Sequence, residues 1–144
     1  MLELRVQAAN LVFADAPLDE AVEGVINGIY FNQGHVCCAG SRLLVQESVY
    51  DDVLERLKRR MSTLRVGDPL DKNTDIGAIN SGEQLTRIRA LSEVGDAEGA
   101  ERWEVACDLP TKGFWFPPTI FTGVSQAHRI AREEIFGPVL SVLT

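Results

Sequence analysis

The stretch at residues 10–46, NLVFADAPLDEAVEGVINGIYFNQGHVCCAGSRLLVQ, decides the fold class of this chain. It opens with a short apolar run, NLVF at 10–13, and closes with another, RLLVQ at 42–46, and each run predicts a buried strand. Between them apolar residues recur at three- and four-residue spacing, which predicts an amphipathic helix: Leu18, Ala21, Val22, Val25, Ile26 and Ile29. Strand, helix and strand in this order are typical of an α/β protein with a parallel sheet.

The beginning of this helix carries several start signals. Asp15 is a candidate N-cap, Pro17 suits the first turn, and the acidic residues that follow complement the helix dipole. Gly24 and Gly28 lie inside the predicted helix, where each glycine costs about 1 kcal/mol relative to alanine. A close-packed neighbour would account for such glycines.

Two further helices are expected downstream. Ser48 and Asp51 resemble a capping box, and apolar residues repeat every four positions after it. Ser81 and Gln84 suggest the cap of a third helix, which is expected to end by Gly95. A basic cluster, RLKRR, closes the second of the three predicted helices, and we expect it to be a solvated face that complements the helix dipole.

The remaining strands are less regular. WEVA at 103–106 predicts one strand, and the apolar run that stops at Thr144 predicts another, after a short helix at 127–133. FWFPPTIFTGV at 114–124 contains two prolines, so we expect at most an edge strand or a strand followed by a bend. The prediction is an α/β fold with a mainly parallel sheet and flanking helices. Because the chain stops inside an apolar run, we expect it to be part of a larger domain.

Composition excludes several classes of partner. The 144 residues suit about one domain, and 14 basic against 21 acidic residues give a net charge of −7. That balance argues against binding a nucleic acid backbone, which needs clustered Lys and Arg. No uncharged run approaches the ~18 residues of a membrane span, and the N-terminus lacks the pattern of a signal peptide. We therefore expect neither a nucleic acid nor a membrane as partner.

Three cysteines, two of them adjacent, do not form a disulfide framework. Neighbouring cysteines rarely pair because the required geometry is strained. This usage favours a reducing compartment, and we expect the protein to be cytoplasmic.

The adjacent cysteines, Cys37 and Cys38, stand in the turn FNQGHVCCAG at 31–40. Small flanking residues leave room for a substrate and let backbone N–H groups approach an oxyanion, which suits a nucleophile. Composition alone leaves open that both thiols are small core hydrophobes. A metal site is disfavoured, because His35 and the two cysteines crowd together without a separated second pair of ligands.

Several separated motifs carry a specific resemblance. FNQGHVCCAGSR, followed by LLVQESVYDDVLERL, resembles the active-site segment of the aldehyde dehydrogenase superfamily. VGDPLD, DIGA, FWFPPTIF and REEIFGPVL follow in the family's order and spacing, so the similarity covers essentially all of residues 1–144. The resemblance implies part of an aldehyde dehydrogenase catalytic domain, without the nucleotide-binding half and the oligomerisation arm.

The family's motifs imply roles for individual residues. The nucleophile is the fourth position of G-Q-x-C, which is Cys37, with Cys38 as bystander. The general base corresponds to Glu3, which lies 34 residues before Cys37. In the E-E-I-F-G-P motif the second glutamate, Glu134, holds ribose hydroxyls, and Phe136 packs beside the nicotinamide. Without the resemblance, Glu134 would be interpreted as a surface carboxylate and Phe136 as a core aromatic.

The resemblance also implies a reaction and its partners. An aldehyde is the substrate, NAD or NADP is the cofactor, bound mainly by parts absent from these residues, and the whole protein is a homo-oligomer. Cys37 forms a thiohemiacetal, hydride transfer leaves a thioester, and Glu3 activates the water that hydrolyses it to a carboxylate.

Three departures from the family pattern qualify this expectation. Arg5 and Val6 replace the two glycines that follow the base, His35 replaces the glutamine of G-Q-x-C, and the chain is several times shorter than family members. We therefore expect the chain to be inactive alone as a fragment. The alternatives are a non-catalytic or truncated family member that acts through protein–protein contacts, and residual esterase chemistry that needs the thiol but no nicotinamide.

Overall fold

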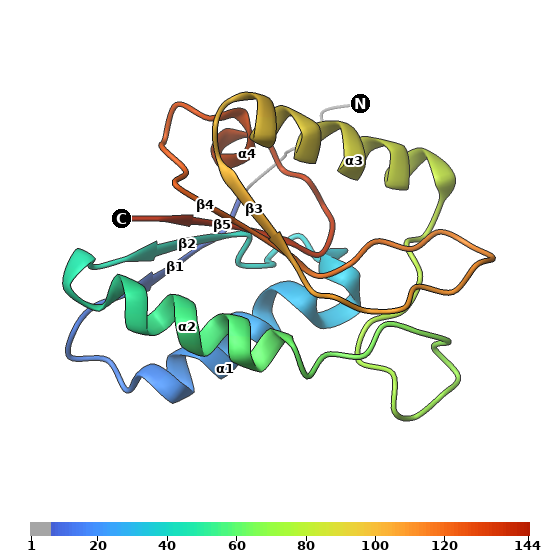
Figure 1. Cartoon of the computed structure of the whole chain (residues 1–144), viewed down its shortest axis with the longest axis horizontal. Coiled ribbons are helices and arrows are strands. Elements are labelled where there is room, and N and C mark those ends of the chain that lie inside the picture. The colour runs from blue at the N-terminus through green and yellow to red at the C-terminus, as the bar shows by residue number, and fades with distance from the viewer. Residues whose placement is uncertain (1–6) are drawn as a thin grey trace.

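In the computed structural model of the chain, which describes residues 7–144, five strands form one sheet in the order β1-β2-β5-β4-β3 (Figure 1). Four neighbouring strands are parallel, and only β3 runs antiparallel, against β4. The strand bounds are Ala9–Val12, Arg42–Val45, Glu101–Glu104, Thr119–Thr122 and Val139–Leu143 for β1 to β5. The mainly parallel sheet expected from the sequence is confirmed.

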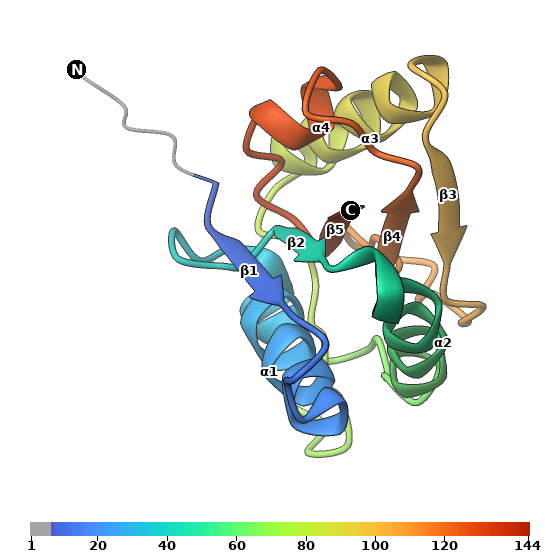
Figure 2. The same cartoon turned by 90° about the vertical axis from the view of Figure 1, so that its left-hand side faces the viewer.

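Helices flank both faces of the sheet. Helices α1 (Leu18–Tyr30) and α2 (Tyr50–Met61) lie against one face, and α3 (Gly82–Ala97) and the short α4 (Arg129–Arg132) lie against the other (Figures 1 and 2). Short 3-10 segments continue α1 and precede α2, and they span Phe31–Gly34 (η1) and Glu47–Val49 (η2). No helix within residues 7–144 is long and apolar enough to cross a membrane.

The core lies in two layers, one on each side of the sheet. The side of α1 and α2 contains the fully buried Tyr30, Leu57 and Met61, and the side of α3 and α4 contains Ile88 and Ile130. Every residue of β4 and β5 is buried. Strands covered on both faces are expected to be nearly continuous in apolar residues, as VLSVL in β5 is.

Strand β4 differs from the sequence prediction. The sequence predicts at most an edge strand or a strand followed by a bend, but β4 lies inside the sheet between β5 and β3. The reason is the position of the prolines: Pro117 and Pro118 precede the strand, so no ladder N–H is lost, and the Pro118 carbonyl accepts from Val105 N–H at 3.0 Å.

The predicted helix caps have mixed outcomes. The Ser81 cap is confirmed, because its Oγ accepts from Gln84 N–H at 3.1 Å. The Asp15 cap is wrong, since Pro17 occupies the N-cap position of α1 without a side-chain cap. The capping box at Ser48 is also wrong, because Ser48 lies within η2, ahead of the first residue of α2.

The basic cluster at 56–60 does more than complement a helix dipole. Arg56 Nη1 lies 2.5 Å from Asp19 Oδ1, and Arg60 Nε lies 2.6 Å from Glu23 Oε1. Both acids belong to α1 and both arginines to α2, so these ion pairs connect the two helices that lie against the same face of the sheet. Exposed pairs of this kind contribute little to stability, because solvent screens them.

Candidate active site

The turn with the adjacent cysteines begins where α1 ends at Tyr30. The following segment η1 contains three consecutive residues, 32–34, with positive φ angles of 49°, 57° and 73°. Left-handed backbone costs about 1–2 kcal/mol for an ordinary side-chain-bearing residue, so contacts from elsewhere must hold this conformation. Cys37 and Cys38 follow, and both are exposed.

The side-chain amide of Gln33 fixes this turn to the loop before α3. Its Nε2 donates to the carbonyl oxygen of Ala78 at 3.0 Å, and its Oε1 accepts from Gly77 N–H at 3.2 Å. Both partners belong to the DIGA motif at 75–78. One amide therefore uses a donor and an acceptor to hold a left-handed residue in place.

Gly34 brings the turn directly against the segment before β5. Gly34 is buried, and a Cβ on it would overlap the carbonyl group of Gly137. Gly137 is crowded from its other side, because a Cβ there would lie 2.6 Å from Cδ1 of Ile88. Only glycine permits such backbone contact. The cysteine turn and the E-E-I-F-G-P segment are therefore immediate neighbours.

His35 connects the turn to both neighbouring segments. Its Nδ1 lies 2.9 Å from the carbonyl oxygen of Phe136, and its Nε2 lies 3.4 Å from Asn80 N, whose N–H it accepts. The imidazole ring of His35 stacks on the phenyl ring of Phe136, with ring centroids 5.4 Å apart and an interplanar angle of 23°. Burial lowers the pKa of His35 below its ordinary value of 6.5, and the bond to the Phe136 carbonyl partly opposes this shift.

Helix α3 holds the other side of the E-E-I-F-G-P segment. Gln84 Nε2 donates to the carbonyl oxygens of Phe136 at 2.9 Å and Ile135 at 3.1 Å. Arg87 Nη2 donates to the carbonyl oxygen of Glu134 at 3.1 Å. Phe136 itself has a φ angle of 57°, an unusual conformation for a residue with a bulky side chain. Three successive carbonyl groups are thus fixed from one helix.

Three of the four sequence-predicted site residues lie within the described residues, on two segments that contact each other. Cys37 is exposed on the turn, and Glu134 and Phe136 are half-buried on the segment that the turn contacts. Cys37 is therefore an exposed residue and not part of the core. Glu3, the predicted base, lies outside the described residues, as do Arg5 and Val6.

Sequence reasoning missed the residues that assemble this site. Gln33 and Asn80 carried no recognised signal, and Gln84 was noticed only as part of a helix cap. Their partners lie 44 to 52 positions away in the chain. The DIGA motif was the related signal in the sequence, because it follows the cysteine turn in the order that the resemblance implies. No local pattern specifies such pairings.

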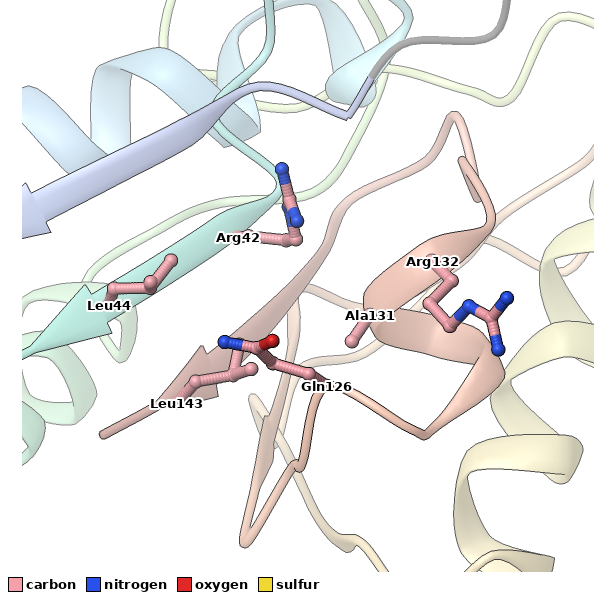
Figure 3. Close-up of a pocket in the computed structure, with 6 residues that line it drawn as sticks. All are labelled: Arg42, Leu44, Gln126, Ala131, Arg132 and Leu143. Atoms are coloured by element: carbon pink, nitrogen blue, oxygen red, sulfur yellow. The ribbon is translucent and has the colours of Figure 1, made fainter.

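A separate pocket of about 250 Å³ lies over β2 and β5 beside α4 (Figure 3). None of its lining residues is a cysteine or belongs to the E-E-I-F-G-P segment: Arg42, Leu44, Gln126, Ala131, Arg132 and Leu143. Across residues 7–144, no group of three or more His, Cys, Asp or Glu side chains is placed to hold a metal ion.

Solved structures of aldehyde dehydrogenases share the fold of this chain. An NAD-dependent aldehyde dehydrogenase from Sinorhizobium meliloti superposes with a TM-score of 0.93 at 43% identity, over 99% of this chain and 28% of that one. An aldehyde dehydrogenase from Pseudomonas aeruginosa gives 0.89 at 44% identity, over 94% and 28%. Betaine aldehyde dehydrogenase from Staphylococcus aureus, solved with NAD+, gives 0.89 at 36% identity, over 94% and 28%.

The chain thus spans little more than a quarter of the length of these enzymes. The sequence also matches the model of the Aldehyde dehydrogenase family over residues 1–144. Together with the fold, this match shows that the chain belongs to the aldehyde dehydrogenase family.

Proposed function

We propose that residues 1–144 are the active-site segment of an NAD(P)-dependent aldehyde dehydrogenase in which Cys37 is the nucleophile. The observation that supports this most is the exposed cysteine turn, packed through Gly34 against the segment that carries Glu134 and Phe136. A thiol used as core filler would be buried. The resemblance assigns Glu134 and Phe136, on the segment that the turn contacts, to the nicotinamide.

The residues present fit one side of a nicotinamide site. Phe136 lies on backbone that His35 and Gln84 hold by hydrogen bonds of 2.9 Å each, so its ring offers a fixed apolar surface beside the cysteine turn. Glu134 is half-buried, and a carboxylate can accept hydrogen bonds from ribose hydroxyls. NAD or NADP, when bound, supplies the hydride acceptor. Most of its binding surface belongs to parts outside these residues.

The chain's own residues then perform two covalent stages. The Cys37 thiolate attacks the aldehyde carbon and forms a C–S bond, and the carbonyl electron pair moves to oxygen. Re-formation of the carbonyl group by that oxyanion would expel hydride, for which bound NAD or NADP would supply the acceptor, and would leave a thioester on Cys37. Glu3 takes a proton from water, the water oxygen attacks the thioester carbon, and the thiolate of Cys37 departs. The product is a carboxylate.

A chimaeric enzyme tests this proposal. The matched segment of the Sinorhizobium meliloti enzyme, 28% of its length, is replaced by this chain, and aldehyde-dependent reduction of NAD+ is measured. We expect turnover in the chimaera, its loss in C37A and its retention in C38A. Retention in C37A with loss in C38A would contradict the assignment. The isolated chain is expected to give no turnover, because most of the cofactor's binding surface is absent from it.

A non-catalytic family member is the second candidate, and Arg5 and Val6 favour it. Glycines at those positions let a ligand approach the backbone closely, which two side chains prevent. If the chimaera is folded but inactive, and R5G/V6G restores turnover while Cys37 is unchanged, the chain as it stands is non-catalytic and serves through protein–protein contacts. Equal turnover with and without the two glycines would remove this candidate.

A further inference from the structure

His35 occupies the position at which the family's G-Q-x-C pattern has glutamine. In the structure it is half-buried and contacts two segments at once: the loop before α3 through Asn80, and the E-E-I-F-G-P segment through Phe136. The contact to Phe136 is double, because the backbone carbonyl is hydrogen-bonded and the two rings are stacked. A histidine at this position therefore has a defined structural task.

The two hydrogen bonds specify one form of the imidazole. A carbonyl oxygen can only accept, so Nδ1 must carry the proton that it donates to Phe136. The N–H of Asn80 can only donate, so Nε2 must be unprotonated. The neutral ring protonated at Nδ1 satisfies both partners, whereas an imidazolium would direct an N–H at another N–H. A side-chain amide has the same set of one donor side and one acceptor side.

Phe136 needs such support because its backbone is left-handed, with φ at 57°. Non-glycine residues in this region persist only where surrounding contacts determine them. Its carbonyl oxygen receives two donors from different elements, His35 Nδ1 and Gln84 Nε2, each at 2.9 Å. Stacking then restricts the ring of the same residue.

We propose that His35 is a positioning residue that fixes both the backbone and the ring of Phe136 against the cysteine turn. Its importance for catalysis rests on the proposed function, which assigns Phe136 to the nicotinamide. The positional claim itself concerns only this chain and is testable without turnover.

The imidazole tautomer is the first test. Nitrogen chemical shifts of His35, measured by NMR on the protein with ¹⁵N-labelled histidine at neutral pH, should show a proton on Nδ1 and none on Nε2. His128, the other histidine, is assigned with an H128A variant. A proton on Nε2 alone would mean that the bond to Phe136 does not exist, and the proposal would be overturned.

Rescue by glutamine is the second test. Amide hydrogen exchange at residues 134–137 should be about twofold to tenfold faster in H35A, the change expected for the loss of one neutral hydrogen bond. It should be near the wild-type rate in H35Q and unchanged in H128A. Exchange in β4 should be the same in all variants, which separates local loosening from global destabilisation. Equal rates in H35A and wild type, or equally fast exchange in H35Q and H35A, would overturn the proposal.

The failure of the proposed function is recognised separately. Iodoacetamide alkylation of Cys37 reports on the nucleophile and not on Phe136. If Cys37 shows no preferential alkylation while the tautomer and exchange results hold, the proposed function is wrong and the positioning role of His35 remains.

Discussion

The imidazole of His35 makes both of its hydrogen bonds only when it is neutral, and this couples the stability of the fold to pH. Burial lowers its pKa below 6.5 in the folded chain, and the unfolded chain binds the proton more readily. The free energy of unfolding should therefore fall as the pH falls below about 6.5, and this contribution stops changing below the folded-state pKa. Above 6.5 the residue contributes no pH dependence.

Denaturant unfolding of the wild type, H35Q and H128Q between pH 4 and 8 measures this coupling. The difference in unfolding free energy between wild type and H35Q should change with pH below about 6.5, because histidine titrates there and glutamine does not. H128Q controls for the loss of a histidine elsewhere in the chain. An identical pH dependence in wild type and H35Q would show that His35 is not held in its neutral form.

Individual site residues were predictable only where a motif identified them. Cys37, Glu134 and Phe136 were proposed through the resemblance of whole motifs, and the structure places them on two contacting segments. The contacts of Gln33 and Gln84 in the site were not predicted, because their side chains bond backbone groups of distant segments. Local propensity carries no information on such partners.

At the level of elements, two glycines inside helices differ in how closely other residues pack against them. A Cβ at Gly24 in α1 would meet nothing within 4 Å among residues 7–144, so close packing against them does not account for this glycine. A Cβ at Gly95 in α3 would lie 3.0 Å from both Ile130 Cδ1 and Phe121 Cε1. Gly95 was expected to end its helix, but α3 continues to Ala97, since this glycine serves close packing and not termination.

The same substitution should therefore change stability in opposite directions. G24A should stabilise the chain by about 0.5–1 kcal/mol, because alanine restricts the unfolded chain and suits a helix. G95A should destabilise it by about 1–3 kcal/mol through overpacking. Urea unfolding followed by circular dichroism measures both. Stabilisation by G95A, or a clear loss in G24A, would show that the packing described around these glycines is incorrect.

The order of elements was predictable because hydrophobic periodicity differs between strands and helices. The alternation at 10–46 is found as β1, α1 and β2 in parallel pairing. Their ends and neighbours were less predictable. The N-cap of α1 is Pro17 and not the predicted Asp15. The interior position of β4 depends on its prolines, which precede the residues that pair with neighbouring strands.

For the whole molecule, the two edges of the sheet differ in chemistry. Edge strand β3 has the sequence ERWE, and charged side chains protect an edge from pairing. Edge strand β1 contains Leu11, which is 61% exposed, and Phe13 directly after it is 57% exposed. We expect the chain, when isolated, to self-associate through β1.

Substitution of Leu11 by lysine tests this expectation. L11K should lower the associated fraction in sedimentation velocity at a given concentration, because a charge on the edge opposes strand pairing. L70K is the matched control, since Leu70 is 93% exposed in a loop outside the sheet. An equal effect of L70K, or no effect of L11K, would exclude the β1 edge as the associating surface.

The central claim is that Cys37 is the nucleophile, and competitive alkylation tests it most directly. All three cysteines are free: Cys37 and Cys38 are exposed, and Cys107 is half-buried. Burial raises the pKa of the Cys107 thiol, and Asp108 and Glu104 add to this shift, so Cys107 should react slowly.

Rates of iodoacetamide labelling at each cysteine, measured by peptide mass spectrometry, give the comparison. Exposure alone predicts similar rates at Cys37 and Cys38. Our account predicts faster labelling at Cys37, because a nucleophilic cysteine must form its thiolate readily. Equal labelling of the two neighbours, or preferential labelling of Cys38, would contradict it.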